Sequence, residues 1–227
     1  MASQGFENGA EAIQVGVIES EVVSAFRAAL GNRGKGLKGT DRADGWVWCM
    51  SGPNSAEAFR AYARSGTRRM GKGDLVLVHC NSHVNGLWTD ITRTFCLSEP
   101  DERQRRIYGA VMSAYETALS AIRAGVGAAQ VDGAARSVLE AHGFGKQFKH
   151  ARGHGVGFSA ISHHSRPRLH PASPDILETG MVFNIEPAVY IGGYGGAGQC
   201  NLIVLTEKGT EVLTPFQQTI ESLMVGR

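Results

Sequence analysis

Five polar side chains interrupt apolar or glycine-rich stretches of this sequence: His79, Asp90, His154, Glu186 and Cys200. A polar group in such a stretch needs a partner, because burial without one costs free energy. All five residue types can also bind metal ions. Imidazole, carboxylate and thiolate groups together suit a borderline transition metal such as zinc or iron better than magnesium or calcium. These residue types therefore indicate a candidate metal site.

Each of these positions also has a purely structural interpretation. Asp90 would cap the strand that follows it or pair with Arg93, and His79 would be a hydrogen-bonded core histidine. Cys200 would be ordinary packing, because buried cysteines behave as small apolar residues. Spacing alone does not decide between one shared site and these separate roles.

A second chemical feature is the segment GHGVGF, residues 153–158, in which glycines surround His154. Such glycines let the backbone approach another group closely while the histidine projects toward it. His150 precedes the segment, and His163 and His164 follow it, so residues 150–164 hold half of the chain's eight histidines. These histidines could act as ligands, as a general acid or as a proton shuttle. A polar surface loop is the alternative, and we expect it to hold for one of His163 and His164.

Other catalytic and cofactor motifs are excluded. The stretch GGYGGAG, residues 192–198, formally contains GxGxxG, but the strand-like NLIVLTE follows where a dinucleotide site needs a helix. We therefore expect a hairpin or rim there and no dinucleotide cofactor. No GxSxG occurs, and no cysteine has a local sequence that marks it as a nucleophile.

Composition narrows the class of protein. The chain has 227 residues, of which 42% are hydrophobic, and its 23 basic and 21 acidic residues give a net charge of +2. This balance gives no electrostatic reason to expect nucleic acid or an anionic membrane as a partner. No apolar run approaches the ~20 residues of a membrane span, and the N-terminus does not read as a signal peptide. Four scattered cysteines without a CxxC pair indicate a reduced, cytoplasmic protein.

The elements that must position these side chains follow from periodicity. In the first part, residues 19–31 predict a helix whose apolar face holds Val22, Val23, Phe26 and Leu30 and which ends at Gly31. A strand is predicted over residues 46–52. Two further strands are predicted near residues 75–79 and 90–96, so that Asp90 opens the second of them.

The second part repeats this order of helices followed by strands. Residues 101–125 predict a long amphipathic helix with the apolar stripe Ile107, Val111, Ala114, Tyr115, Ala118, Leu119 and Ile122. Residues 131–143 predict a second helix, with His142 on its apolar side and Gly143 at its end. Residues 181–191 alternate as a strand, with Asn184 and Glu186 on one face. The repeated order predicts two similar halves in one α+β domain.

Longer motifs carry a family resemblance. GDLVLV, NGxxTDITRTF, HxxGHGVGF, TGMVFNIEPAVY and LIVLTEKGTEVLT resemble the pita-bread (M24) superfamily of metallopeptidases, which contains Xaa-Pro aminopeptidases, prolidases, methionine aminopeptidases and creatinase. The likeness is greatest to the Xaa-Pro aminopeptidase and prolidase branch, from about Glu11 to Thr214. It implies an α+β pita-bread fold with two pseudo-symmetric halves, as a single catalytic-type domain over residues 1–227. The family's N-terminal domain is expected to be absent from this chain.

The resemblance also implies a ligand set. Members of the superfamily hold two metal ions, often Mn, Co or Zn, with two Asp, one His and two Glu ligands. Asp90, His154 and Glu186 match the second Asp, the His and the first Glu. His79 falls where the first Asp is expected, and Cys200 falls where the last Glu is expected. A neutral imidazole offers one lone pair and no charge, so the two-metal arrangement is in doubt.

Further positions depart from the family pattern. Gly198 falls where an arginine is expected, and Phe59 falls where a substrate-binding histidine is expected. Ile161 falls on a further histidine position, which His163 would fill if the loop is two residues longer. The resemblance therefore implies a related site with a different pocket.

The expected activity is hydrolysis of an amide or related C–N bond in a small peptide-like molecule. One divalent Mn, Co, Zn or Fe ion per chain, or none, would be held by Asp90, His154 and Glu186, with His79 and Cys200 as optional ligands. The catalytic groups would be Glu186 as ligand or base, His154 itself, and His150 or His163 as proton donor. The alternatives are metal-independent creatinase-like or redox C–N chemistry, and a non-catalytic homologue that binds peptide or protein. A homodimer is one expectation for the assembly.

Overall fold

The computed structural model of the protein describes residues 2–34, 38–60, 64–150, 153–159, 165–216 and 219–226. Its helices are α1 (Ala2–Ala10), α2 (Glu19–Gly34), α3 (Glu102–Ala121) and α4 (Ala128–Ala141), with the short 3-10 segments η1 (Gly52–Glu57) and η2 (Gly145–Gln147). Its strands are β1 (Ala43–Ser51), β2 (Leu75–Val84), β3 (Leu87–Leu97), β4 (Gly153–His154), β5 (Arg168–Leu169), β6 (Val182–Ile185), β7 (Ala188–Ile191), β8 (Gly195–Gly198), β9 (Asn201–Thr206), β10 (Gly209–Val212) and β11 (Met224–Val225).

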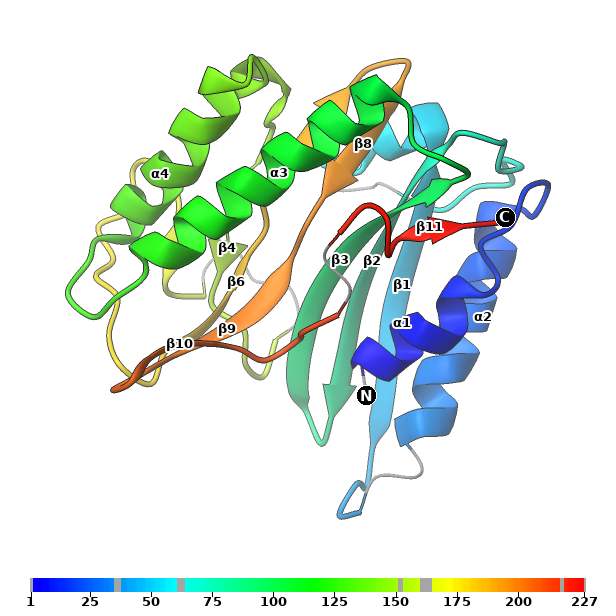
Figure 1. Ribbon diagram of the computed structural model, residues 1–227. Coiled ribbons are helices and arrows are strands. Elements are labelled where there is room, and N and C mark those ends of the chain that lie inside the picture. Colours follow the sequence, from blue (N-terminus) through cyan, green and yellow to red (C-terminus); the bar gives the residue numbers. More distant parts are fainter. Residues whose placement is uncertain are drawn as a thin grey trace.

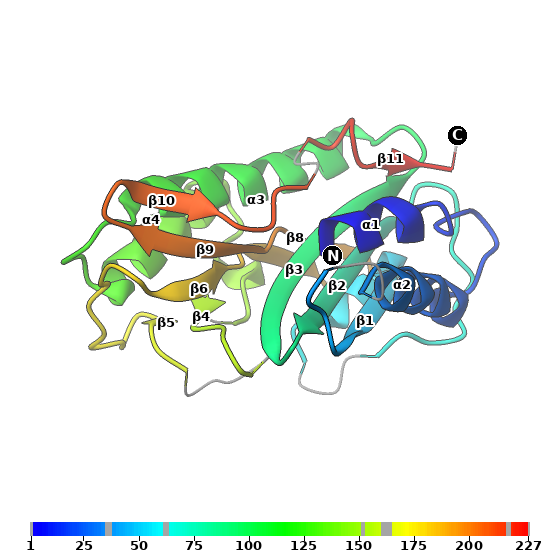
Figure 2. The same cartoon turned by 90° about the horizontal axis from the view of Figure 1, so that it is seen from below.

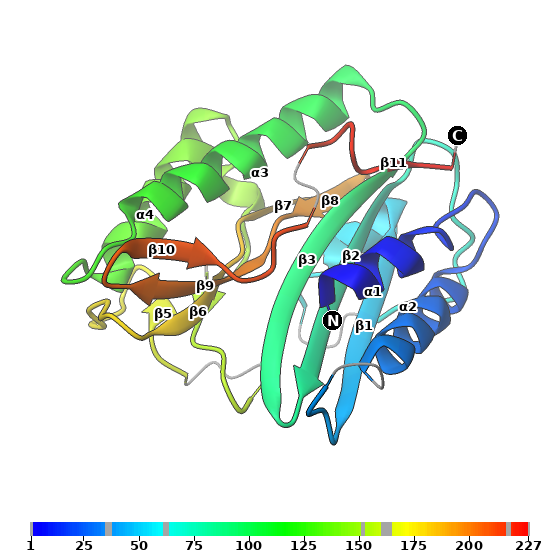
Figure 3. The ribbon, with the colours of Figure 1, turned by 60° about the horizontal axis from the view of Figure 1, so that its bottom comes forward.

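The first half is built on three long antiparallel strands, β1, β2 and β3, to which the short β11 adds in parallel. Helices α1 and α2 cover one face of this sheet (Figures 1 and 3). Because side chains alternate along a strand, Val76 and Val78 of β2 pack in the core that contains α1 and α2. Leu75 and Leu77 point the other way, into a second core beneath α3 and α4. The sheet therefore contributes to both cores.

The second half packs α3 and α4 against the sheet β10–β9–β6 and the hairpin β7–β8 (Figure 1). Helix α3 begins with a capping box, in which Asp101 and Gln104 each accept from the other's backbone N–H. The predicted apolar stripe of α3 is buried at Ile107, Val111, Ala114, Tyr115 and Ala118. Figure 2 shows the two halves side by side, each with its own strands and pair of helices.

The halves are joined at β3. Thr92 and Cys200 form an antiparallel bridge with N···O distances of 3.3 and 3.1 Å. Two residues further along β3, the Thr94 hydroxyl accepts from the Gly198 N–H and donates to its carbonyl. From the opposite face of β3, Arg93 donates a hydrogen bond of 2.8 Å to the Cys200 carbonyl. These contacts fix Cys200 against the strand that carries Asp90.

Helix α1 is an element that the sequence patterns did not predict. Its sequence contains Gly5 and Gly9, which disfavour an isolated helix. A Cβ at Gly5 would lie 2.5 Å from Leu30, and a Cβ at Gly9 would lie 2.4 Å from the Phe26 ring. The two glycines therefore let α1 lie directly on α2, so that tertiary packing stabilises the helix.

Three predicted details are wrong. Helix α2 continues past Gly31 to Gly34, because Gly31 lacks the positive φ with which a glycine ends a helix. His142 is exposed at the C-cap of α4 rather than on its apolar side, whereas Gly143 does take a positive φ of 81°. Strand β3 begins at Leu87, so Asp90 lies inside the strand rather than at its start.

No helix within the described ranges is both long enough and apolar enough to cross a membrane.

Candidate metal and catalytic site

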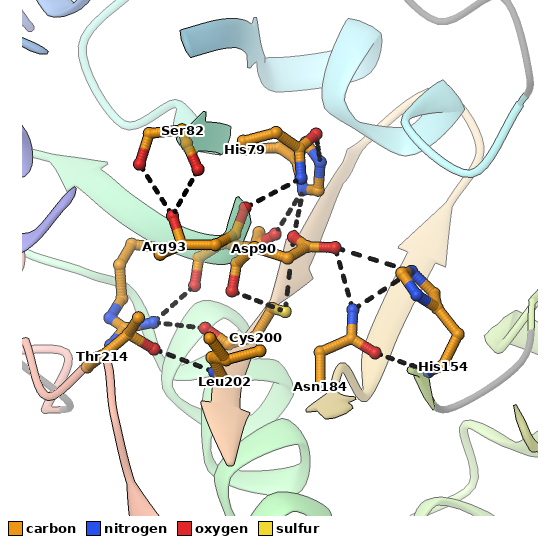
Figure 4. Close-up of polar contacts among 12 residues, drawn as sticks. His79, Ser82, Asp90, Arg93, His154, Asn184, Cys200, Leu202 and Thr214 are labelled. Carbon is orange, nitrogen blue, oxygen red and sulfur yellow. Dashed lines mark hydrogen bonds and ion pairs between the residues drawn. The ribbon is translucent and has the colours of Figure 1, made fainter. Parts of the chain in front are cut away.

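The five polar residues singled out in the sequence line one cavity of about 500 Å³. His79 and Asp90 come from the neighbouring strands β2 and β3, and His154 comes from β4. Glu186 follows β6, and Cys200 lies between β8 and β9. Figure 4 shows His79, Asp90, His154 and Cys200 pointing toward one another. Residues that are far apart in the sequence thus converge at the junction of the two halves.

Asp90 is the centre of this group and is 1% exposed. Nδ1 of His79 and Nε2 of His154 each lie 3.6 Å from one of its carboxylate oxygens. Asn184 donates to Oδ2 of Asp90 at 2.9 Å. Arg93 points to the opposite face of β3 and donates to Oδ1 of Asn201, so the alternative pairing of Asp90 with Arg93 does not form.

Cys200 and Glu186 complete a compact ligand group with Asp90. One ligand atom of each of the three residues lies within 4.8 Å of the other two. The Cys200 Sγ is 3.6 Å from Oδ1 of Asp90. Burial, followed by the charges of Asp90 and Glu186, raises the pKa of the Cys200 thiol well above its usual value. The closeness of these three residues makes them candidate ligands of a single ion.

His154 is positioned by close backbone contacts. A Cβ at Gly153 would lie 2.0 Å from the Asn184 carbonyl oxygen, and one at Gly155 would lie 2.1 Å from the Arg166 carbonyl oxygen. Nδ1 of His154 lies 3.0 Å from the Gly155 carbonyl, which can only accept, so Nδ1 carries a proton. In the neutral ring Nε2 then has the lone pair, and this is the atom that faces Asp90.

Both ring nitrogens of His79 have hydrogen-bond partners. Its Nδ1 lies 2.8 Å from the Thr92 hydroxyl, and its Nε2 lies 2.9 Å from Oδ1 of Asn81. The imidazole also stacks on the Trp48 ring, with centroids 4.7 Å apart and an interplanar angle of 11°. A bond from His79 to a metal would have to replace one of these hydrogen bonds.

The remaining wall of the cavity is aromatic. Nε2 of His150 lies 3.0 Å from the Tyr190 hydroxyl oxygen. Burial, followed by the charge of Glu186, raises the pKa of Tyr190, which therefore stays a neutral phenol. Phe59 packs against the Tyr190 ring at 5.5 Å, where the resemblance places a polar histidine. Phe59 and Tyr190 therefore give this side of the cavity an apolar lining.

The predictions for Ile161, His163 and His164 stay predictions, because these three residues lie outside the described ranges. Gly198 lines the cavity, and a Cβ there would be 3.3 Å from the Ala188 Cβ, so the position lacks room for the family's arginine unless its neighbours move.

Reasoning from the sequence missed several residues that contact the site, among them Asn81, which bonds to His79, and Tyr190, which bonds to His150. Asn184 contacts both Asp90 and His154. Thr92 and Trp48 contact the His79 ring. The alternation of residues 181–191 had placed Asn184 on the same face as Glu186, which was the available signal for it. Trp48 and Thr92 could be found only from the strand register, which pairs both with His79.

Known proteins are similar to this chain in sequence and in fold. The chain matches the model of metallopeptidase family M24 over residues 1–207. It is 31% identical over 220 residues to the putative dipeptidase YkvY of Bacillus subtilis (strain 168), covering 97% of this chain and 58% of that protein. The structure is similar to the Xaa-Pro dipeptidase from Bacillus anthracis, with a TM-score of 0.88, 28% identity, and coverage of 99% of this chain and 59% of that one.

A further match is the prolidase from Pyrococcus furiosus, with a TM-score of 0.84 and 31% identity over 95% of this chain and 61% of that one. The chain thus spans about three fifths of the length of these relatives. The α+β pita-bread fold expected from the sequence motifs is confirmed by these matches. The protein is a member of metallopeptidase family M24.

Proposed function

We propose that the chain hydrolyses an amide bond in a peptide-like substrate, with one divalent transition metal ion held by Asp90, His154 and Cys200 beside Glu186. The observation that carries this proposal is the group of Asp90, Glu186 and Cys200, whose ligand atoms lie within 4.8 Å of one another in the cavity. Membership of a metallopeptidase family supports it.

The spacing of the side chains suits one ion. Ligand bonds of ~2.0–2.3 Å place two ligands of a tetrahedral ion about 3.3–3.8 Å apart. Oδ1 of Asp90 lies 3.6 Å from the Cys200 sulfur, and Oδ2 of Asp90 lies 3.6 Å from Nε2 of His154. Nε2 of His154 also lies 3.3 Å from Nδ2 of Asn184, so a metal bond to His154 would replace this contact. A thiolate would add the soft ligand that favours zinc or iron.

A second ion does not fit the same residues. Both ring nitrogens of His79 are hydrogen-bonded, and the ring brings no charge where a carboxylate would bind. Cys200 cannot bridge two ions as a carboxylate does, so one ion would lack both its terminal and its bridging ligand. We therefore leave His79 outside the ligand set.

A bound ion would lower the pKa of a water molecule and so supply the nucleophile. In a tetrahedral site, Asp90, His154 and Cys200 would hold the ion and leave one position for this water, with Glu186 as the base that accepts its proton. His150 lines the same cavity and is oriented by Tyr190, so it can donate a proton to the departing amine. Trp48, Met50 and Phe59 add apolar surface to the cavity wall, against which the apolar part of a substrate could pack.

The charges of the cavity suit a peptide with a free carboxylate. In this proposal Asp90 and Glu186 serve the metal ion and its water, so their charges are not free to pair with the substrate. Arg60 and Arg168 line the same cavity with positive charge, which complements the carboxylate of a short peptide. This arrangement supports a peptide rather than an uncharged amide as substrate.

The test is metal content combined with activity. Elemental analysis of the purified protein should give one transition metal ion per chain, and a chelator should remove both the ion and the hydrolysis of peptides. Adding back one equivalent of zinc, manganese or cobalt should restore activity, and Asp90→Ala should prevent it. Two ions per chain would contradict the one-metal proposal.

A second candidate is metal-independent hydrolysis by the same residues. His79 and His154 lie beside the buried carboxylate of Asp90 and could act as acids or bases. Asn184 donates a hydrogen bond to the same carboxylate. Activity that survives complete removal of metal, and that is lost in His154→Ala, would establish this candidate in place of the first.

A further inference from the structure

All three tryptophans of the chain lie on one face of the first sheet. The register forms three rows across β1, β2 and β3: Trp48–His79–Thr92, Trp46–Asn81–Asp90 and Asp44–His83–Trp88. Directly paired residues of antiparallel strands share a face, as do residues two apart on one strand. Trp46, Trp48 and Trp88 therefore lie on the face that carries Asp90. The intervening residues Val47 and Val78 are buried in the opposite core.

The aromatic surface begins inside the cavity and leaves it. Trp48 lines the cavity and stacks on His79. One row further along the sheet, Trp46 meets the Trp88 ring, with centroids 5.3 Å apart. Trp88 also packs on His83 at 4.5 Å. Trp46 and Trp48 are two residues apart on β1 and so share this face, which places the outer rings next to the cavity on the way to the β2–β3 turn.

Phe158 ends this series. The Trp88 N–H donates to the Gly157 carbonyl at 2.8 Å, which fixes the segment after His154 along the edge of β3. The Phe158 ring lies close to Gly86 in the β2–β3 turn, at 3.7 Å from the position of a Cβ there. We call Trp46, Trp48, Trp88 and Phe158 the aromatic strip.

The outer part of the aromatic strip is open to solvent. Trp46 is 52% exposed and Phe158 is 82% exposed. Tryptophan and phenylalanine gain much of their stabilising free energy from burial, and contiguous exposed apolar surface marks a binding site. The exposed parts of the Trp46 and Phe158 rings are therefore available to a ligand.

From this continuity with the cavity, we propose that the aromatic strip binds the part of an extended peptide that continues out of the cavity, through proline or aromatic side chains. The proposal rests on the proposed function for its assumption that a peptide occupies the cavity.

Distance and chemistry support this occupant. The row that contains Trp48 and the row that contains Trp88 are four residues apart along the strands, which corresponds to about 14 Å. An extended polyproline-type segment rises ~3.1 Å per residue, so about four residues would span the strip. Proline-rich segments dock on grooves lined by aromatic rings, because little conformational freedom is lost on binding.

The test is the affinity for peptides of different length, measured by calorimetry on chelator-treated protein so that no turnover occurs. We expect the hexapeptide Ala-Pro-Pro-Pro-Pro-Pro to bind at least about ten-fold tighter than the dipeptide Ala-Pro. Trp46→Ala or Trp88→Ala should reduce this ratio about five-fold or more. Leu87→Ala is the matched control, because Leu87 is 57% exposed on the same hairpin but on its other face, and it should leave the ratio unchanged.

Several results would overturn the inference. Equal affinity for the two peptides, or a ratio that Trp46→Ala does not change, would exclude an extended peptide site. Tighter binding of a glucose hexasaccharide than of the peptide would assign the strip to a sugar. A dimer that Trp46→Ala dissociates without a change in peptide affinity would assign it to a second copy of the chain. If the tryptophan variants fail to fold, Phe158→Ala takes their place, because its side chain is mostly in solvent.

Failure of the proposed function is distinguishable from these results. Length-dependent binding in a protein that hydrolyses no peptide would overturn the hydrolase proposal and support the aromatic strip. Hydrolysis of dipeptides and hexapeptides with the same KM would support the hydrolase proposal and overturn the aromatic strip as a peptide-binding site.

Discussion

Asn184 donates a hydrogen bond of 2.9 Å from Nδ2 to Oδ2 of Asp90. Its Oδ1 accepts from the His154 backbone N–H at 2.6 Å. One buried amide therefore orients two candidate metal ligands that belong to different halves of the protein. Partners that hold metal ligands in place commonly affect metal affinity nearly as much as the ligands themselves.

Asn184→Ala should lower metal affinity by about 10–100-fold, because both Asp90 and His154 lose a contact that fixes their orientation. It should also lower the free energy of unfolding by about 1–3 kcal/mol, because the His154 N–H stays buried without this acceptor. Calorimetric titration of zinc into metal-free protein measures the first effect, and urea unfolding measures the second.

Ser82→Ala is the control for this variant. Ser82 is buried in β2 and is hydrogen-bonded to Thr89, but it lies on the face away from the cavity. It should reduce stability without a comparable loss of metal affinity. An equal loss of affinity in both variants would mean that metal binding follows stability rather than the orientation of Asp90 and His154.

Cys200→Ser should weaken zinc binding by more than about ten-fold, because a hydroxyl is a much poorer ligand than a thiolate for a borderline metal. Competition with a chromogenic chelator gives the affinity. The matched variant Cys96→Ser changes another buried cysteine, which contacts Gln104 outside the cavity. Unchanged zinc affinity in Cys200→Ser would remove Cys200 from the ligand set.

The double variant His79→Asp with Cys200→Glu should raise the metal content from one toward two ions per chain. The substitutions restore the two carboxylates that the family resemblance expects, and the additional negative charge favours a second divalent ion. Elemental analysis after dialysis against manganese measures the stoichiometry. A value that stays at one would show that the stacking of position 79 beside Trp48 has remodelled the cavity beyond its ligands.

Stability should fall in alkali through Cys49. Burial, followed by the charge of Glu19, raises the pKa of the Cys49 thiol far above its ordinary value of 9.0. Above about pH 9 the unfolded chain releases the proton while the folded protein keeps it. The stabilisation is therefore complete below pH 9 and decreases at higher pH, by about 1.4 kcal/mol per pH unit.

Cys49→Ala removes this contribution, so the unfolding free energy should fall less steeply between about pH 9.5 and 11, by up to about 1.4 kcal/mol per unit. Urea unfolding at several pH values gives the slope. Val47→Ala, on the same face of β1, should lower stability at every pH without changing the slope. Parallel slopes for the wild type and Cys49→Ala would refute the assignment.

The long elements could be predicted because their patterns are local. The apolar period of α3 and the buried run of β2 are visible in short windows of sequence. Helix α1 could not be predicted from the sequence, because it depends on the close fit of Gly5 against Leu30 and of Gly9 against Phe26. Only the folded chain brings these residues together. The end of α2 at Gly34 likewise depends on backbone conformation that residue type does not determine.

The candidate site likewise has residues that could be predicted from the sequence and contacts that could not. Asp90, His154 and Glu186 stand in motifs long enough to be matched, and the cavity brings them together. The hydrogen bonds of His79 to Thr92 and Asn81 could not be foreseen, because they depend on strand register and on rotamers. Trp46 and Trp88 are 42 positions apart in the sequence, and their contact exists only through β2 between them.

The bridge between Thr92 and Cys200 also has a consequence for folding. Asp90 and Cys200 are separated by 110 positions, so the pocket closes only when the last strands reach β3. Contacts of such long range form slowly, because a large loop must be ordered first. A nascent chain that has not yet emerged beyond Cys200 lacks the complete ligand set. A metal ion bound at the proposed site would therefore stabilise the finished fold but not its early intermediates.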